Sequence, residues 1–166
     1  MEISKGIVIT TSDHTKQWLP QLLESIKGTN YPVTIHNNGS EGGWEMAGVQ
    51  KGKDIYDEFV HLMDTTVIKD ISLFDKLFAI DGNVFLTEGG YHYMGKFLSN
   101  ELPNLPVVSN KQEAINQELK WFKGMKYSLF SPNLPVHTDV FETKHDQRRM
   151  KMENDYMIKW KGTYQI

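Results

Sequence analysis

The sequence contains no cysteine among its 166 residues and no long hydrophobic run. The absence of cysteine excludes disulfides, thiolate metal ligands and a cysteine nucleophile, so a bound metal would need oxygen or imidazole ligands. The absence of an apolar run of roughly 20 residues argues against a membrane-spanning helix, and the start of the chain does not have the pattern of a signal peptide. We therefore expect a soluble cytoplasmic protein without a membrane span, and Mg²⁺ or Mn²⁺ chemistry rather than structural zinc.

Three common catalytic fingerprints are also missing. The sequence has no phosphate-binding loop with Gly-Lys-Ser/Thr, no GxGxxG after its first strand-like segment and no GxSxG elbow. These absences disfavour a P-loop ATPase, a dinucleotide-dependent enzyme and a serine hydrolase. The net charge of -3 further argues against a protein that mainly coats nucleic acid.

The apolar residues that are present fall into strand-like and helix-like runs that alternate along the chain. Strands are predicted at 6–11, 31–36, 58–63 and 83–87, and helices at 18–26, 44–53, 71–78, 109–122 and 143–160. Segment 88–97 has no clear pattern, and the two prolines of 131–136 predict a loop. The alternation predicts an α/β, Rossmann-like fold, with a mostly parallel sheet flanked by helices in a single domain.

Polar side chains follow three of the predicted strands. Thr10 and Ser12 lie at the end of the first, Asn37 and Asn38 follow the second, and Asp64 follows the third. In an open parallel sheet, ligands bind at the carboxyl ends of the strands. Amides can hydrogen-bond the edge of a nucleobase, and a carboxylate can hold a cation that bridges two phosphates. Asn-Asn-Gly is also a common turn sequence, but the combination of these residues predicts a nucleotide site.

The order of these features resembles the nucleotide-binding half of glycosyltransferases with the GT-A fold. The similarity covers roughly residues 6–97. Within it, Val60-His-Leu-Met-Asp64-Thr-Thr-Val-Ile-Lys-Asp70 and the following Leu73-Phe-Asp-Lys-Leu-Phe78 are similar to small viral and bacterial proteins of this class. The C-terminal runs 141–144, 148–156 and 161–164 resemble them as well. The resemblance implies one GT-A-like domain, with a nucleotide-binding half at 1–97 and an acceptor-side half at 98–166.

The resemblance also implies roles for the polar residues at the strand ends. It places Thr10 and Ser12 in the donor pocket, Asn37 and Asn38 on the nucleobase, and Asp64 on the diphosphate. Asp64 would act there through Mn²⁺ or Mg²⁺.

The sequence departs from the family pattern at the metal site. The family usually has Asp-x-Asp, whereas this chain has Asp64-Thr65-Thr66 and therefore one carboxylate. His137 is a candidate for a further metal ligand, with His145 as an alternative.

An inverting transfer needs a carboxylate that deprotonates the acceptor hydroxyl. We expect Glu118 to be this base, because the resemblance places its helix on the acceptor side, and Glu113 and Asp139 are alternatives. Arg148 and Arg149 are candidates for binding the diphosphate, because guanidinium groups pair bidentately with phosphate oxygens.

The expected activity is transfer of a sugar from a nucleotide-diphosphate sugar, with UDP favoured, to a hydroxyl acceptor. The acceptor would be a glycan or a hydroxymethylated base of viral DNA. The DNA hypothesis is motivated by segment 144–161, where six Lys or Arg stand against three acids, and a viral enzyme would act in the host cytoplasm. The short acceptor half suggests a large acceptor or a homo-oligomer that completes the cleft. A nucleotidyltransferase and a catalytically inactive nucleotide-sugar-binding module remain alternatives.

Overall fold

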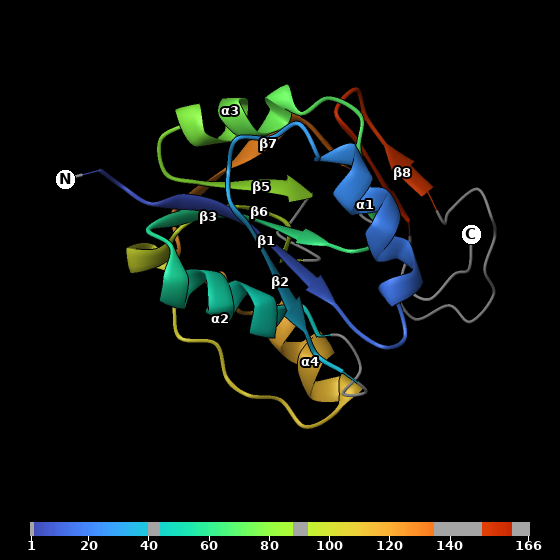
Figure 1. Cartoon of the computed structure of the whole chain (residues 1–166). Helices are drawn as coiled ribbons and strands as arrows, with labels where there is room; N and C mark the ends of the chain where they lie inside the picture. Colours follow the sequence, from blue (N-terminus) through green and yellow to red (C-terminus); the bar gives the residue numbers. More distant parts are fainter. Residues whose placement is uncertain (1, 40–43, 88–92, 135–150, 161–166) are drawn as a thin grey trace.

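The computed structural model describes residues 2–39, 44–87, 93–134 and 151–160, which form an α/β fold with two sheets (Figure 1). The larger sheet has the strand order β2-β1-β3-β6-β5-β7, and the smaller sheet has the order β4-β9-β8. The strands of the larger sheet are β1 (Lys5–Thr11), β2 (Val33–Asn37), β3 (Glu58–Met63), β5 (Asn83–Thr87), β6 (Gly95–Leu98) and β7 (Tyr127–Leu134). Those of the smaller sheet are β4 (Thr66–Ile68), β8 (Lys151–Glu153) and β9 (Met157–Trp160).

The larger sheet is mixed rather than parallel throughout. Strand β1 pairs in parallel with both β2 and β3, and β5 pairs in parallel with β7, whereas β6 runs antiparallel between β3 and β5. Strand β6 falls in segment 88–97, which the sequence pattern left unassigned. A side chain at Gly95 would meet the backbone oxygen of Val84 at 2.3 Å, so this strand needs a glycine where strand-forming residues are normally expected.

Helices cover both faces of the larger sheet. The helical elements are η1 (Lys16–Trp18), α1 (Leu19–Ser25), α2 (Met46–Ile55), α3 (Ser72–Ala79), η3 (Ser99–Glu101) and α4 (Lys111–Glu118). One core cluster contains residues of α1 and α3 together with Met152 and Met157 of the smaller sheet, and a second contains residues of α2 with Trp121. No helix of the described residues is long and apolar enough to cross a membrane.

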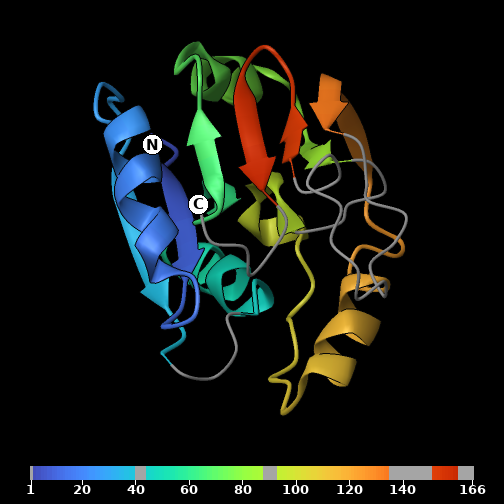
Figure 2. The same ribbon diagram turned by 90° about the vertical axis from the view of Figure 1, so that its right-hand side faces the viewer.

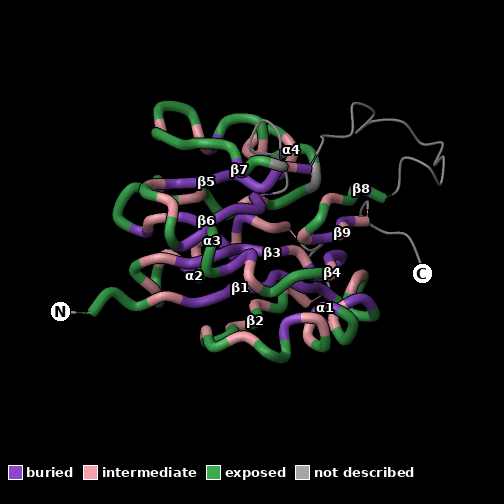
Figure 3. The backbone as a smooth tube through the Cα atoms, turned by 90° about the horizontal axis from the view of Figure 1, so that it is seen from above, coloured by how far each residue is buried: buried purple, intermediate pink, exposed green. Residues whose placement is uncertain are grey.

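The burial of β1 explains its unbroken apolar run. Ile7 and Ile9 belong to the first core cluster and Val8 to the second, so successive side chains enter opposite cores. A strand that is covered on both faces favours apolar residues at successive positions rather than at alternate ones. Figure 3 shows the same burial along β1, β3, β5 and β6.

Most of the predicted elements are confirmed, but two predictions in the C-terminal half are wrong. The predicted loop at 131–136 is strand β7 as far as Leu134, since β7 is an edge strand and tolerates a proline there. The predicted helix at 143–160 is instead the hairpin of β8 and β9 over its described part. There the Asn154 side chain accepts the N–H groups of Tyr156 and Met157, which closes the turn between the strands.

Helix α4 is shorter than the predicted helix at 109–122 and begins two residues later. Its cap is Asn110, because the Asn110 side chain accepts the N–H of Glu113 at 2.9 Å. The Glu113 carboxylate in turn accepts the Ser109 N–H at 2.7 Å. The helix ends at Glu118 and is followed by turns.

Candidate functional site

The strand order creates a topological switch point between β1 and β3. The chain leaves β1 through α1 to reach β2 on one side, and then crosses through α2 to reach β3 on the other side. Neighbouring connections therefore diverge at the carboxyl ends of β1 and β3, which is where open α/β sheets bind ligands. Figure 2 looks onto this edge of the sheet, and the hairpin of β8 and β9 (red) lies in front of it.

Asp64 lies at this switch point, directly after β3. Its side chain is buried, with 3% exposed. One carboxylate oxygen, Oδ2, accepts hydrogen bonds from the Thr11 hydroxyl at 2.7 Å and the Thr15 hydroxyl at 2.5 Å. Burial raises the pKa of Asp64 above its usual value, and the hydroxyls of Thr15 and Thr11 oppose that rise. The predicted acid is thus held in a fixed position by Thr11 at the end of β1 and by Thr15 in the loop that follows.

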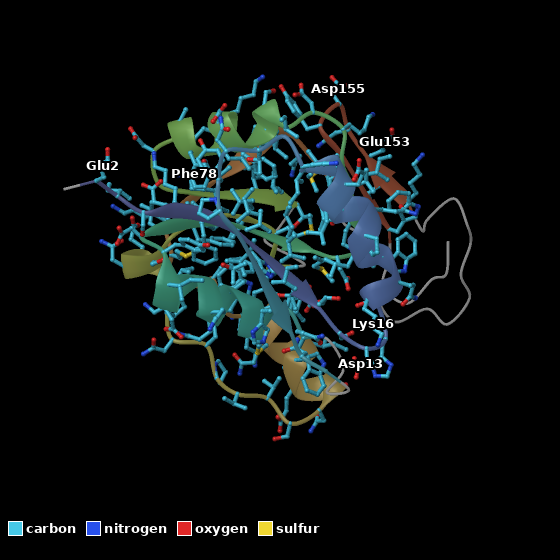
Figure 4. All side chains as sticks on the ribbon, viewed as in Figure 1. Glu2, Asp13, Lys16, Phe78, Glu153 and Asp155 are labelled. Carbon is cyan, nitrogen blue, oxygen red and sulfur yellow. The ribbon has the colours of Figure 1, made fainter. Side chains whose placement is uncertain are left out.

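The loop after β1 wraps around Asp64. The Ser12 backbone oxygen accepts the N–H of Lys16 at 2.8 Å, and the Ser12 hydroxyl lies 3.1 Å from that of Thr15. Ser12, which was predicted to line the donor pocket, is completely buried and supports this turn. Asp13 and Lys16 form the outer surface of the loop, where they make an exposed ion pair of 3.7 Å (Figure 4).

The predicted donor residue Thr10 points into the interior. Its hydroxyl lies 2.7 Å from Nε2 of His61, and Nδ1 of His61 lies 2.8 Å from the Tyr93 backbone oxygen. A carbonyl can only accept, so Nδ1 carries the proton and Nε2 accepts from Thr10. Burial lowers the pKa of His61 to about 4, which keeps the ring neutral. The side chain of Thr10 therefore joins β1 to β3 beneath the site.

Asn37 and Asn38 shape the loop after β2. The Asn38 amide donates to the Trp44 backbone oxygen at 2.8 Å, and the Asn37 side-chain oxygen accepts the Gly39 N–H at 2.7 Å. The Asn38 N–H also donates to the Thr11 backbone oxygen at 2.9 Å. These contacts place both residues beside the carboxyl end of β1, as predicted, and give them a turn-forming role there.

Lys159 of β9 is a site residue that the sequence interpretation missed. Its side chain is fully buried, and its ammonium donates to the Thr65 hydroxyl at 2.8 Å and to the backbone oxygen of Trp160. The Trp160 N–H donates to the Thr65 backbone oxygen at 2.9 Å, which fixes β9 beside Asp64. In the structure, buried Met157 and Lys159 alternate with half-buried Ile158 and Trp160, but the sequence Met-Ile-Lys-Trp carries no matching alternation of apolar and polar residues.

Two further carboxylates influence the same site. Burial raises the pKa of Glu45, the residue before α2, to about 8, and the charge of Glu118 adds to the rise. Burial lowers the pKa of Lys159 to about 8, against the charges of Glu45, Asp64 and Glu118. Glu118, the predicted base at the end of α4, therefore acts on the same two groups, Glu45 and Lys159, as Asp64 does. Glu45 was not predicted, because an acid before a helix is ordinary helix-capping chemistry.

An aromatic pair borders the site. The rings of Trp18 and Trp160 lie 5.2 Å apart between centroids, at an angle of 41°. Trp18 is buried, whereas Trp160 is half-buried. A partly exposed indole next to a buried cation offers a flat apolar surface to a nucleobase or a sugar ring.

The other predicted site residues fall outside the described part of the chain. These are Asp139, His137, Arg148 and Arg149, together with the alternative ligand His145.

The described residues fit a divalent metal poorly. Among them, no three His, Asp or Glu side chains are grouped closely enough to hold a metal ion. Asp64 already accepts two hydroxyl hydrogen bonds at Oδ2, and a buried ammonium occupies the adjacent position. A Mg²⁺ or Mn²⁺ site normally uses several oxygen ligands in near-octahedral geometry.

Comparison of the chain with protein-family models, with curated protein sequences and with solved structures gave no match.

Proposed function

We propose that this protein is a glycosyltransferase that takes a sugar from a nucleotide-diphosphate sugar and passes it to a hydroxyl acceptor. The observation that carries the proposal is the placement of Asp64 and Lys159 together at the switch point of the sheet. A carboxylate held by two hydroxyl groups can accept from a sugar or ribose hydroxyl, while an ammonium can attract phosphate oxygens. Asp64 could thus bind the sugar or ribose of such a donor, and Lys159 its diphosphate.

The surroundings of this pair are consistent with the rest of the donor. The loop formed by Asn37 and Asn38 lies beside the end of β1 and is the proposed contact for the nucleobase, with UDP favoured. Trp160 offers a face for stacking. Glu118 is the proposed base, because its charge acts on the same buried groups as Asp64. The proposed acceptors are a glycan or a hydroxymethylated base of DNA.

A thermal-shift screen with UDP- and GDP-sugars tests donor binding at Asp64. The wild type should be stabilised by one nucleotide family, and Asp64→Asn should lose that stabilisation while remaining folded. The matched control is Asp54→Asn, which removes an exposed carboxylate at the other end of the sheet and should respond like the wild type. A shift that survives in Asp64→Asn would place the donor elsewhere.

A nucleotide-sugar-binding module without activity is the second candidate. The observation in its favour is that Asp64-Thr65-Thr66 has a single carboxylate where the resembled family usually has two. Donor binding without release of nucleoside diphosphate would support the module and contradict the transferase.

A further inference from the structure

Two lysines of the described residues are almost completely buried: Lys96 is 1% exposed and Lys159 is 0% exposed. Lysine is almost never fully buried unless it is paired, because removing an ammonium from water is costly. The two residues therefore need separate explanations.

Lys96 is explained by the fold. Its ammonium donates to the Ile80 backbone oxygen at 2.6 Å and to the Gly82 backbone oxygen, just after the end of α3. Carbonyl groups at the end of a helix carry partial negative charge and favour a cation. The acids Glu58, Asp81 and Glu101 also favour its charged form. Lys96 thus stabilises the amino-end edge of the larger sheet.

Lys159 lies at the opposite, carboxyl-end edge, where the charges of Glu45, Asp64 and Glu118 favour its charged form. Within the described residues, both of its hydrogen bonds go to neutral oxygens, the Thr65 hydroxyl and the Trp160 carbonyl. An ammonium has three N–H donors, so these two bonds leave one for a further acceptor. An apolar side chain would fill a buried strand position without the desolvation cost of a charge.

Burial favours the neutral form of two of the three acids that act on Lys159, Glu45 and Asp64. Burial raises the pKa of Glu45, which reduces the negative charge that this carboxyl presents to a phosphate near neutral pH. Asp64 is ionised less readily than an exposed aspartate, and the hydroxyls of Thr11 and Thr15 stabilise its charge. The diphosphate of a donor would thus meet a fixed cation with part of the surrounding negative charge neutralised.

We propose that Lys159 supplies the positive charge that binds the diphosphate of the donor, so that donor binding requires no divalent cation. This inference rests on the proposed function, because it assigns the diphosphate to the same switch point. It also accounts for the single carboxylate of Asp64-Thr65-Thr66, since a site that uses a fixed ammonium has no need of a second metal-binding acid. Asp64 is then available to accept from a hydroxyl of the donor rather than to hold a metal.

The test is a calorimetric titration of the full chain with UDP and with GDP, in EDTA and in Mn²⁺. The dissociation constant of the nucleotide that binds should agree within about threefold between the two conditions. Lys159→Met should weaken binding at least tenfold in EDTA, and Lys159→Arg should retain part of the affinity because it keeps the charge. Lys96→Met is the matched control: it removes the other buried ammonium and should lower the melting temperature without changing the affinity.

The outcomes separate this inference from the proposed function. Binding in Mn²⁺ but not in EDTA would overturn the role of Lys159 and leave the proposed function standing. Metal-free binding that is unchanged in folded Lys159→Met would also overturn it. If neither nucleotide binds under either condition, the proposed function fails and the inference fails with it. The comparison of EDTA with Mn²⁺ uses the wild type, so it decides the metal requirement even if Lys159→Met does not fold. In that case Lys159→Arg tests the lysine itself, and an affinity equal to that of the wild type would overturn its role.

Discussion

Acidification should destabilise the protein through His61. This side chain is completely buried, with Nδ1 bonded to the Tyr93 backbone oxygen and Nε2 bonded to the Thr10 hydroxyl. A second proton would have to enter at Nε2, where it would break the bond from Thr10 and create a buried charge. For this reason the pKa of His61 falls from 6.5 to about 4.

The direction and size of the effect follow from that depressed pKa. Between pH 6.5 and about 4 the unfolded chain binds a proton at His61 that the folded protein does not, so stability falls as the pH falls through this window. A tenfold change in proton affinity corresponds to about 1.4 kcal/mol. The depressed pKa of His61 should therefore lower the free energy of unfolding by about 3 kcal/mol over the whole window, and by about 2 kcal/mol between about pH 7 and pH 5. This loss is a large fraction of the ~5–15 kcal/mol that stabilises an ordinary domain.

Glu45 acts in the opposite direction, so the contribution of His61 has to be isolated. Because the pKa of Glu45 is raised to about 8, the folded protein binds a proton there that the unfolded chain lacks, and stability rises as the pH falls from about 8. Urea unfolding of the wild type and of His61→Gln, at a series of pH values, separates the two effects. The difference in unfolding free energy should shrink as the pH falls, because only the wild type carries the imidazole.

A difference between wild type and His61→Gln that does not change from about pH 7 to pH 4 would refute the reasoning. Nitrogen NMR of the wild type provides a check that needs no variant. It should show a neutral ring protonated at Nδ1 near pH 6, and a protonated imidazolium at that pH would contradict the assigned hydrogen bonds.

Two further predictions concern packing and capping. Gly48→Ala would place a new Cβ 1.7 Å from the Thr10 hydroxyl oxygen. The change should destabilise the protein by roughly 3 kcal/mol, because it overpacks the core and breaks the buried hydrogen bond between Thr10 and His61. Gly28→Ala is its control in urea unfolding, since it meets only the end of the Ile71 side chain at 3.1 Å, and equal losses in both variants would contradict this account. Asn110→Ala should cost about 1 kcal/mol through loss of the cap on α4. Asn110→Asp should retain most of that stability, and equal destabilisation by Ala and Asp would show that the cap is not the cause.

The N-terminal half of the fold is predictable because its patterns are local. The apolar run at 6–11 and the helical spacing after Trp18 appear in the structure as β1 and as η1 followed by α1. The polar ends of β1 and β3 also meet as predicted, since a parallel sheet brings the carboxyl ends of these strands to one edge, where Thr11 donates to Asp64.

The C-terminal half is less predictable because its structure depends on distant partners. Strand β9 is a short segment that gains its conformation by pairing with β4, far away in the sequence. The spacing of Tyr156, Met157 and Trp160 fits one face of a helix, so Lys159 was placed on the wrong type of element. The antiparallel strand β6 was missed for a similar reason, because Gly95 is required by the close approach of Val84 and weakens the local strand pattern.

Release of nucleoside diphosphate tests the proposed transferase most directly. The wild type would be incubated with UDP- and GDP-sugars, with and without glycan or hydroxymethylated-DNA acceptors, and compared with Asp64→Asn. We predict that one donor yields nucleoside diphosphate, that an acceptor increases the rate, and that Asp64→Asn abolishes release although it is folded. Binding of a donor without release in the presence of these acceptors would contradict transfer and favour the binding module. Release of pyrophosphate from a nucleoside triphosphate would instead identify a nucleotidyltransferase.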